Sequence, residues 1–331
     1  MTQAVVVSPW PLGGTGALSF DRTIDRGRVH RSAVSEVFIT DVRRLGDDRV
    51  VLAAQLPTCH AYFDDHDPAT AVDPLLILEV CRQAGLATAY ELGLPTNVVL
   101  VTGDWDLRVA GPDAWSGGAP TVDLRVDSTF TWTRVRRGRP RAGTCEQHVF
   151  AGDRHVATLR ASSQFLDYGE LEVLRTEQRG TPPPRTADLV ARPDPELLQP
   201  HVVGRRLPGN VLLAGLLRGE DEVSARVVLP LANRALFDHS YDHVTMQVLL
   251  EAARQLAVAA VVGGDGAAAG WHVSRLTGKF TRFAELDAPV TVRAASGAAP
   301  AAERELLVVV EQEGHRVAEI DLILTRESTL R

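Results

Sequence analysis

Two glutamates stand in almost wholly apolar segments, and each is followed three positions later by an arginine. The pairs are Glu79 with Arg82 and Glu251 with Arg254. On a helix, residues three apart lie on one face and can touch. Because an unpaired buried charge is costly, such residues pair, line a cavity or change protonation. The pairs are therefore either structural ion pairs, or a pocket wall in which glutamate is a general base and arginine binds an anion.

Histidines stand at matched places upstream of the two glutamates. His66 and His239 each end a polar loop before the apolar segment that carries the glutamate. A histidine beside aspartate in a loop is usually solvated or capping, but the matched placement favours a shared role. His239 and His243, with Asp238 and Asp242 beside them, have the spacing of a divalent-metal site only if the segment is helical. No cysteine or histidine cluster supports a metal, and phosphate-loop, dinucleotide and nucleophile-elbow motifs are absent, so neither metal nor cofactor is expected.

The two charged pairs belong to an internal repeat. Each half reads as a β-hairpin (36–57 and 210–230), a long buried helix (75–92 and 244–262) and further antiparallel strands. Asp73 and Pro74 supply the cap and first turn of the first helix. The further strands are predicted at 97–106, 121–135, 143–150 and 155–167, and at 271–283, 289–294, 305–312 and 315–325. The chain is therefore an α+β protein in which each half wraps a sheet over one helix.

The repeat also sets the domain boundaries. Residues 1–28 match neither half and are expected to form a loosely packed N-terminal arm. Residues 29–170 form the first repeat and 200–331 the second. Between them, 171–199 reads as a linker, extended and partly polyproline-like around the proline-rich and charged stretch 176–185.

Composition excludes several classes of protein. A net charge of −7 argues against a nucleic-acid groove. The two long helices carry central charges and lie between strand patterns, so they are poor membrane spans. The start of the chain lacks a secretory signal, and the 3 cysteines show no metal spacing, which is typical of reduced thiols in the cytoplasm. We therefore expect a cytoplasmic protein with no membrane or nucleic-acid partner.

These features resemble the hotdog fold, in which an antiparallel sheet wraps a central helix. The first half, from His60 to His66 and on to Glu79 and Gln83, looks like the active-site region of 3-hydroxyacyl-ACP dehydratases, whose catalytic histidine and acid map to His66 and Glu79. Arg82 replaces a small or apolar residue of that family. The whole chain more closely resembles the A-factor biosynthesis (AfsA-like) family of γ-butyrolactone, butenolide and furan synthases, which carry two hotdog repeats. The matching motifs are Asp238-His239-x-x-Asp242-His243, Glu251-x-x-Arg254-Gln255, Phe283-Ala-Glu285-Leu-Asp287-x-Pro289 and, in the first half, Glu79-x-x-Arg82-Gln83.

The resemblance implies an acyltransferase. Its reaction joins a β-ketoacyl group from acyl carrier protein to the hydroxyl of dihydroxyacetone phosphate, which gives the phosphorylated precursor of a signalling molecule. By this hypothesis Glu79 or Glu251 takes the hydroxyl proton, with His66 and His239 as further catalytic residues. Arg82, Arg254, Asp242 and His243 are the candidates for binding substrate and phosphate. Amides at a helix N-terminus would stabilise the oxyanion.

The arrangement of the two sites follows from hotdog dimers, in which the loop of one unit meets the helix of the other. His66 would then face Glu251, and His239 would face Glu79. We expect the second helix to hold the main site, because its motif match is denser. The chain would be a monomer with an internal pseudo-dimer, or a homodimer. Two alternatives stay open: a dehydratase, hydratase or thioesterase acting on acyl-ACP or acyl-CoA, and a non-catalytic protein that binds an acyl ligand.

Overall fold

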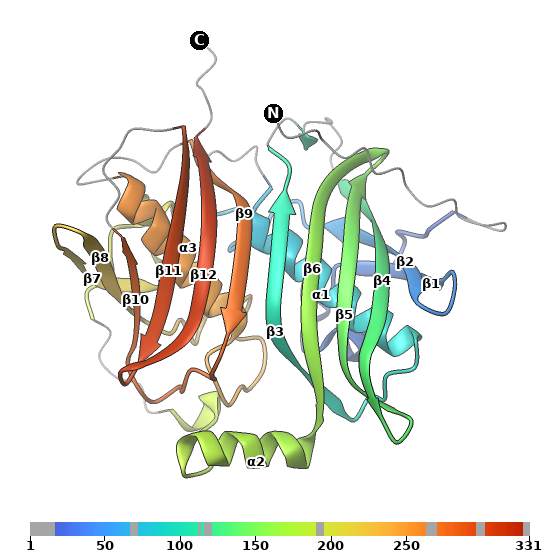
Figure 1. The fold of residues 1–331 in the computed structure, drawn as a ribbon. Coiled ribbons are helices and arrows are strands. Elements are labelled where there is room, and N and C mark those ends of the chain that lie inside the picture. Colours follow the sequence, from blue (N-terminus) through green and yellow to red (C-terminus); the bar gives the residue numbers. More distant parts are fainter. Residues whose placement is uncertain are drawn as a thin grey trace.

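The computed structural model describes residues 17–66, 72–111, 114–115, 121–189, 195–262, 270–295 and 302–326. Its strands form one antiparallel sheet of 12 strands, in the order β1-β2-β4-β5-β6-β3-β9-β12-β11-β10-β8-β7. If β7 to β12 are counted as the first to sixth strands of the second half, both halves have the same strand order from the edge of the sheet to its centre. The sheet therefore has a pseudo-two-fold axis between its two central strands (Figure 1).

The two halves repeat the same order of elements. The first contains β1 (Ile39–Arg44), β2 (Arg49–Leu56), α1 (Pro74–Glu91), β3 (Val98–Val109), β4 (Val122–Arg136), β5 (Arg139–Ala151) and β6 (Arg154–Asp167). The second contains β7 (Leu213–Arg218), β8 (Glu222–Val227), α3 (Met246–Val262), β9 (Trp271–Phe280), β10 (Val290–Ala295), β11 (Glu303–Gln312) and β12 (His315–Arg326). This is the double hotdog layout expected from the sequence.

The helices α1 and α3 lie on one face of the sheet and fill its core (Figure 1). Asp73 caps α1 by accepting a hydrogen bond from the Leu75 amide, at 2.8 Å, and Pro74 stands in the first turn. Buried residues on both helices belong to one hydrophobic cluster that runs through the two halves. No helix in the described ranges is both long and apolar enough to cross a bilayer.

The halves meet along the central strands β3 and β9. Trp105 on β3 is in register with Gly278 on β9, and a Cβ added to Gly278 would come within 2.5 Å of the indole nitrogen. Beside them Arg275 forms an ion pair with Asp106 across the junction, at 2.9 Å. Only glycine therefore fits opposite this tryptophan, and the junction is closely packed.

The linker contains a helix that the sequence prediction missed. Helix α2 (Tyr168–Arg179) covers the start of the segment expected to be extended. Asp167 and Glu170 form a reciprocal capping box at its N-terminus, and Gly180 ends it in the left-handed conformation. Arg175 is buried against the second half, so α2 is a packed bridge between the halves (Figure 1).

The N-terminal arm is also better fixed than expected over its described part. The amide of Ile24 donates to the Ile39 carbonyl, and the Ser19 amide donates to the side chain of Asp41. Residues 17–28 therefore run beside β1, and residues 1–16 lie outside the described part of the chain.

Candidate active site

The first charged centre surrounds the carboxylate of Glu79 on α1. Arg31 and Arg82 each contact it with two nitrogens, at 2.7–3.0 Å. Gln83 of the same helix and Gln247 of α3 donate to it as well, at 2.7 and 3.0 Å. Glu79 therefore accepts hydrogen bonds from four side chains, and one of these comes from the other half.

The second charged centre surrounds Glu251 on α3 in the same way. Arg205 and Arg254 each donate two hydrogen bonds to its carboxylate, at 2.7–2.9 Å. Gln255 donates a fifth, and the Tyr62 hydroxyl contributes a sixth from the first half at 3.2 Å. The guanidinium of Arg205 also lies over the Tyr62 ring, 4.5 Å from its centroid.

The arginines keep both glutamates ionised. Burial would raise the pKa of Glu79, but Arg31 and Arg82 outweigh it and hold that pKa well below its usual value of 4.5. For Glu251, burial likewise opposes ionisation, and Arg205 with Arg254 lowers the pKa to about 2. A saturated carboxylate with so low a pKa is a poor general base near neutral pH. The assignment of proton transfer to Glu79 or Glu251 therefore finds no support in this geometry.

Arg31 and Arg205 are the two arginines of these centres that the sequence analysis missed; it also missed Gln247 and Tyr62. Each follows a short 3-10 helix, η1 (Arg26–Val29) or η5 (Pro200–Val203), and one residue in the left-handed conformation separates helix and arginine. That residue is His30 in the first half and Gly204 in the second, with φ of 53° and 72°. The sequence does contain a signal for these arginines, because the repeat extends upstream of the hairpins. In both halves a valine, Val29 or Val203, stands two residues before the arginine.

Loops are exchanged between the halves. The loop before α3 reaches the first centre, where Asp238 accepts from the Ser32 amide at 2.7 Å and lies 3.7 Å from Arg31. The loop before α1 reaches the second centre, where Arg205 donates to the carbonyl of Tyr62 at 2.7 Å. The expected exchange is therefore present.

In the described part of the chain, neither His66 nor His239 contacts the glutamate that it was expected to face. At the second centre Tyr62 is the loop side chain that hydrogen-bonds Glu251, while the imidazole of His66 contacts its own loop at the Phe63 carbonyl, at 2.9 Å. At the first centre His239 is linked to Glu79 through Asp238 and Arg31.

Two histidine–aspartate pairs stand beside the first centre. His239 contacts Asp238, and His243 contacts Asp242 at 2.6 Å through its Nδ1. Burial would raise the pKa of Asp242, but the hydrogen bond from His243 and the charge of Arg175 lower it to about 2. An ionised carboxylate only accepts hydrogen bonds, so Nδ1 of His243 carries a proton, and Nε2 is the acceptor nitrogen when the ring is neutral.

The segment that carries these histidines is not helical. Residues 238–243 form a loop that ends before α3, so His239 and His243 lack the helical spacing on which the metal alternative depended. Tyr241 instead stands between them, with its ring centroid 4.0 Å from that of His239 and 6.5 Å from that of His243.

The two centres differ in their access to solvent. Tyr62 covers Glu251, but the equivalent loop position in the second half is Ala235, whose carbonyl accepts from Arg31 at 3.4 Å. The side chain of Arg82 is 22% exposed, while that of Arg254 is 9% exposed. The first centre therefore has an alanine where the second has Tyr62, and its helix arginine is the more exposed of the two, while both glutamates are fully buried.

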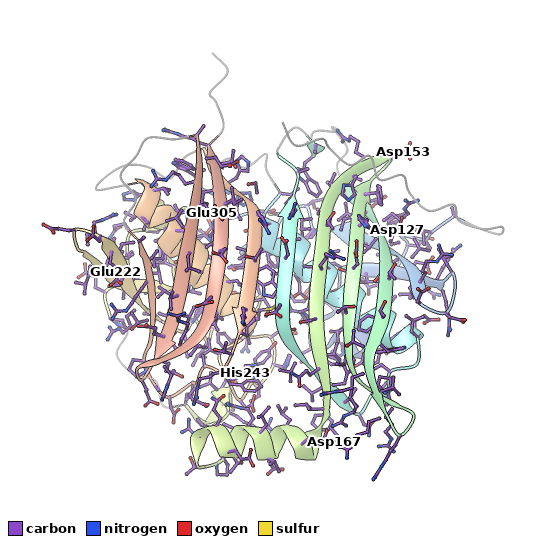
Figure 2. All side chains as sticks on the ribbon, in the orientation of Figure 1. Asp127, Asp153, Asp167, Glu222, His243 and Glu305 are labelled. Carbon is purple, nitrogen blue, oxygen red and sulfur yellow. The ribbon has the colours of Figure 1, made fainter. Side chains whose placement is uncertain are left out.

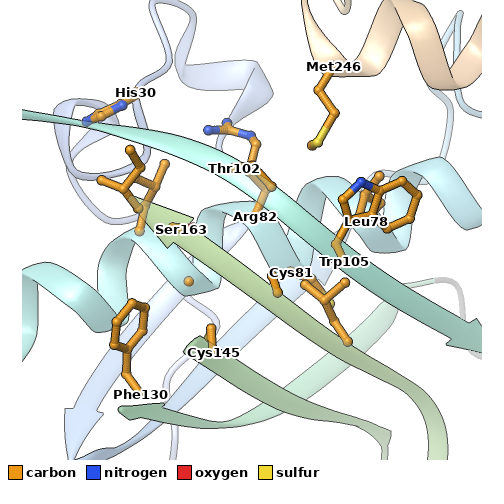
Figure 3. Close-up of a pocket in the computed structure, with 15 residues that line it drawn as sticks. His30, Leu78, Cys81, Arg82, Thr102, Trp105, Phe130, Cys145, Ser163 and Met246 are labelled. Carbon is orange, nitrogen blue, oxygen red and sulfur yellow. The ribbon is translucent and has the colours of Figure 1, made fainter. Parts of the chain in front are cut away.

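Two described cavities open at Arg82. One, of about 140 Å³, runs between α1 and the sheet and is lined by His30, Cys81, Gly85, Trp105 and Phe130 among others (Figure 3). The other, of about 380 Å³, is lined by Arg82, His243 and Gln247 together with residues of β3 and α2. Figure 2 places His243 at the seam between the halves, above α2. The open site thus combines the helix of the first half with the loop of the second, whereas the sequence favoured the second helix.

Sequence comparison identifies the relatives of this chain. The family model of the A-factor biosynthesis hotdog domain matches residues 15–167 and 187–325. The chain belongs to this family. It is 32% identical over 275 residues to a 2-oxo-3-(phosphooxy)propyl 3-oxoalkanoate synthase of Streptomyces virginiae, covering 82% of this chain and 87% of the relative. A synthase of the same name from Streptomyces griseus is 31% identical over 301 residues, covering 88% and 90%.

A solved structure supports the fold of this member of the family. The 12:0-ACP thioesterase from Umbellularia californica superposes with a TM-score of 0.52, covering 84% of this chain and 94% of the thioesterase, at 11% identity. At that identity the likeness concerns the hotdog architecture alone.

Proposed function

We propose that this protein transfers a β-ketoacyl group from a thioester to the hydroxyl of dihydroxyacetone phosphate. The relatives' name describes such a product, since it is the ester of a 3-oxoalkanoate with a phosphorylated oxopropyl alcohol. The observation that carries the proposal is the position of Arg82, which is partly exposed and lines two cavities. One cavity is mostly apolar, and the other is also lined by His243, whose ring is held by Asp242. We propose acyl carrier protein as the thioester donor and the single chain as the functional unit.

Arg82 is the phosphate-binding group of the proposal. Its Nε and one terminal nitrogen hold Glu79 and the Val29 carbonyl, while its other terminal nitrogen bonds no residue in the described part of the chain. A guanidinium fixed on one side presents its remaining donors in a rigid plane, which suits a phosphate. Glu79 acts as the anchor that keeps this plane in position.

His243 is the general base of the proposal. Its Nδ1 is held by Asp242, so its Nε2 takes the proton from the acceptor hydroxyl as the hydroxyl oxygen attacks the thioester carbon. The carbon–sulfur bond then breaks, and the proton passes from the imidazolium to the thiolate that leaves. The products are the ester and a free thiol, and no acyl-enzyme is required because both substrates are bound side by side.

The smaller cavity is the proposed binding slot for the acyl chain. Its walls are mostly apolar, and Gly85 adds no side chain to the face of α1 that lines it. Trp105 also lines it, with an indole nitrogen that is buried and has no hydrogen-bond partner among the described residues. A buried donor without a partner is costly. A carbonyl oxygen of the bound acyl group would satisfy this donor.

Product analysis tests the proposed function. The purified protein would be mixed with a β-ketoacyl thioester, with and without dihydroxyacetone phosphate, and the products identified by mass spectrometry. The expected product is a phosphorylated ester that forms only when both substrates are present. Loss of water or release of free acid without the phosphate substrate would instead indicate a dehydratase or thioesterase, and bound thioester without turnover would indicate a binding protein.

Matched substitutions distinguish the two centres. Arg82→Lys keeps the charge but loses the planar donor set, so we expect the KM for dihydroxyacetone phosphate to rise roughly tenfold or more. Arg254→Lys, at the covered centre, is the control and should change that KM little. A larger effect of Arg254→Lys, measured by initial rates at varied acceptor concentration, would move the site to α3.

A further inference from the structure

A run of arginines stands out in this acidic protein. Residues 134–141 contain arginine at positions 134, 136, 137, 139 and 141, and residues 131–143 contain no aspartate or glutamate. The chain as a whole carries a net charge of −7. A local excess of one sign attracts partners of the opposite sign and accelerates their encounter. This basic hairpin (Arg134–Arg141) has no role in the reaction proposed above.

The structure places the basic hairpin at the turn between β4 and β5. Arg136 pairs with Arg139 across the turn, and Arg137 adopts a left-handed conformation with φ of 51°. The hairpin from Arg134 to Arg139 is exposed, including Val135, which is 55% exposed. Apart from the backbone pairing of Arg136 with Arg139, the side chains of Arg136, Arg137 and Arg139 form no hydrogen bond or ion pair with the residues that the structure describes. Their charges are therefore available to a partner.

The basic hairpin is tied to the helix that lines the larger cavity. Arg141 forms an ion pair with Glu170 in the first turn of α2, which ties the hairpin to that helix. Further along α2, Leu171, Leu174 and Gln178 line the cavity that contains Arg82 and His243. The β4–β5 turn and α2 stand at the same end of the molecule (Figure 1). Tyr168, at the start of α2, adds an apolar ring that is 65% exposed.

The basic hairpin exists in one half only. The equivalent connection of the second half joins β10 to β11, and its sequence Ser296-Gly-Ala-Ala-Pro300 has no charge. Helix α2 carries exposed Glu172 and Glu177, so the positive charge is confined to the hairpin. The asymmetry matches that of the two centres, since the basic hairpin belongs to the half whose helix lines the open site.

We infer that the basic hairpin is the docking site for an acidic protein that delivers the acyl thioester. This inference rests on the proposed function, because it assigns the partner that the donor substrate requires. The arginines would bind carboxylates on the carrier, while Val135 and Tyr168 would contact its apolar residues. Docking there places the thioester beside α2, from which the cavity leads to Arg82. Exposed charges of this kind act on encounter and are screened by salt.

The test compares one acyl group on three donors. The same β-ketoacyl group would be supplied on an acyl carrier protein, on coenzyme A and on N-acetylcysteamine. The triple variant Arg136→Glu/Arg137→Glu/Arg139→Glu should raise the KM for the carrier-linked donor roughly tenfold or more and weaken its dependence on salt. Turnover of the N-acetylcysteamine donor should be unchanged. Arg136→Glu alone, compared with Arg226→Glu on the distant strand β8, gives a matched pair of single charge reversals.

Each other outcome overturns the inference. An unchanged KM for the carrier-linked donor would show that the carrier docks elsewhere. A rise confined to the coenzyme A donor would show that the hairpin binds the phosphates of that cofactor. An equal loss with N-acetylcysteamine would show an effect on the catalytic site itself. The failure of the proposed function is a separate result, because the wild-type protein would then form no ester from any of the three donors.

Discussion

At the scale of single residues, the carboxylates and the histidines have separate roles. Glu79 and Glu251 each accept hydrogen bonds from four side chains, so they hold arginines rather than protons. His243 has one nitrogen fixed by Asp242 and lines the cavity with Arg82. We therefore propose that the loop before α3 supplies the group that transfers the proton and that α1 supplies the group that binds the anion.

Replacement of His243 tests this division. His243→Gln removes the proposed base, so we expect kcat to fall about 10²–10⁴-fold with little change in the KM for dihydroxyacetone phosphate. His239→Gln is the control, because His239 is paired with Asp238 in the same manner. Steady-state rates with saturating thioester would measure both, and a larger loss of kcat in His239→Gln would transfer the role to that residue.

The two buried glutamates also make the free energy of unfolding depend on pH. The folded-state pKa of Glu251 is about 2, below its ordinary value of 4.5, so the unfolded chain binds protons first as pH falls. The stabilisation is fully present above about pH 4.5 and is lost as pH falls towards 2, roughly 3 kcal/mol for this group. Urea unfolding between pH 6 and 3 measures the slope. A free energy of unfolding that stays constant over this range would contradict the expectation.

At the scale of elements, helix α2 lies in the connection between the halves and holds Asp242, the partner of the proposed general base His243. Arg175 donates to the Asp242 carbonyl at 2.9 Å and to its carboxylate at 3.3 Å, and both terminal nitrogens bind Glu285 at 2.8 Å. Its guanidinium also lies 4.5 Å from the centroid of the Phe283 ring. The orientation of the His243–Asp242 pair therefore depends on a helix outside both repeats.

Two arginines of α2 allow this role to be tested. Arg175→Lys cannot reproduce the fork that binds Glu285 and Asp242, so we expect kcat to fall about tenfold, and the pH at which kcat is half-maximal to shift. Arg179→Lys, one turn later, should leave kcat unchanged because Arg179 pairs with Glu285 and Asp287 and not with Asp242. Equal losses in the two variants would indicate a general loosening of α2 rather than positioning of Asp242.

The elements that the sequence predicted are those with a local signal. Helix α1 follows from an apolar run behind Asp73 and Pro74, and most strands follow from alternation bounded by turns. Helix α2 was missed because its charged sequence resembles a linker, and its buried face is defined by contacts with residues of the other half, among them Asp242, Phe283 and Glu285. Arg82 was among the predicted binding residues, but the sequence favoured the second helix, because the difference between Ala235 and Tyr62 at matched loop positions has no local signal of its own.

At the scale of the whole molecule, the two halves form one continuous sheet through β3 and β9. Gly278→Ala would place a Cβ within 2.5 Å of the Trp105 indole, so we expect a loss of about 1–3 kcal/mol in the free energy of unfolding. Gly209→Ala is the control, because no atom lies within 4 Å of its added Cβ. Denaturant unfolding would measure both variants. A Gly278→Ala variant as stable as the wild type would show that β3 and β9 can shift to accommodate the added methyl group.

The same continuity has a genetic consequence. A homodimer inherits every codon change twice, once in each subunit, so its two sites must change together. Here each copy of the repeat has its own codons, and the exchanged loops still build both sites. One gene can therefore acquire Tyr62 at one centre and keep Ala235 at the other, or add arginines to a single hairpin. A repeat within one reading frame can therefore carry two centres that differ, which two identical subunits cannot.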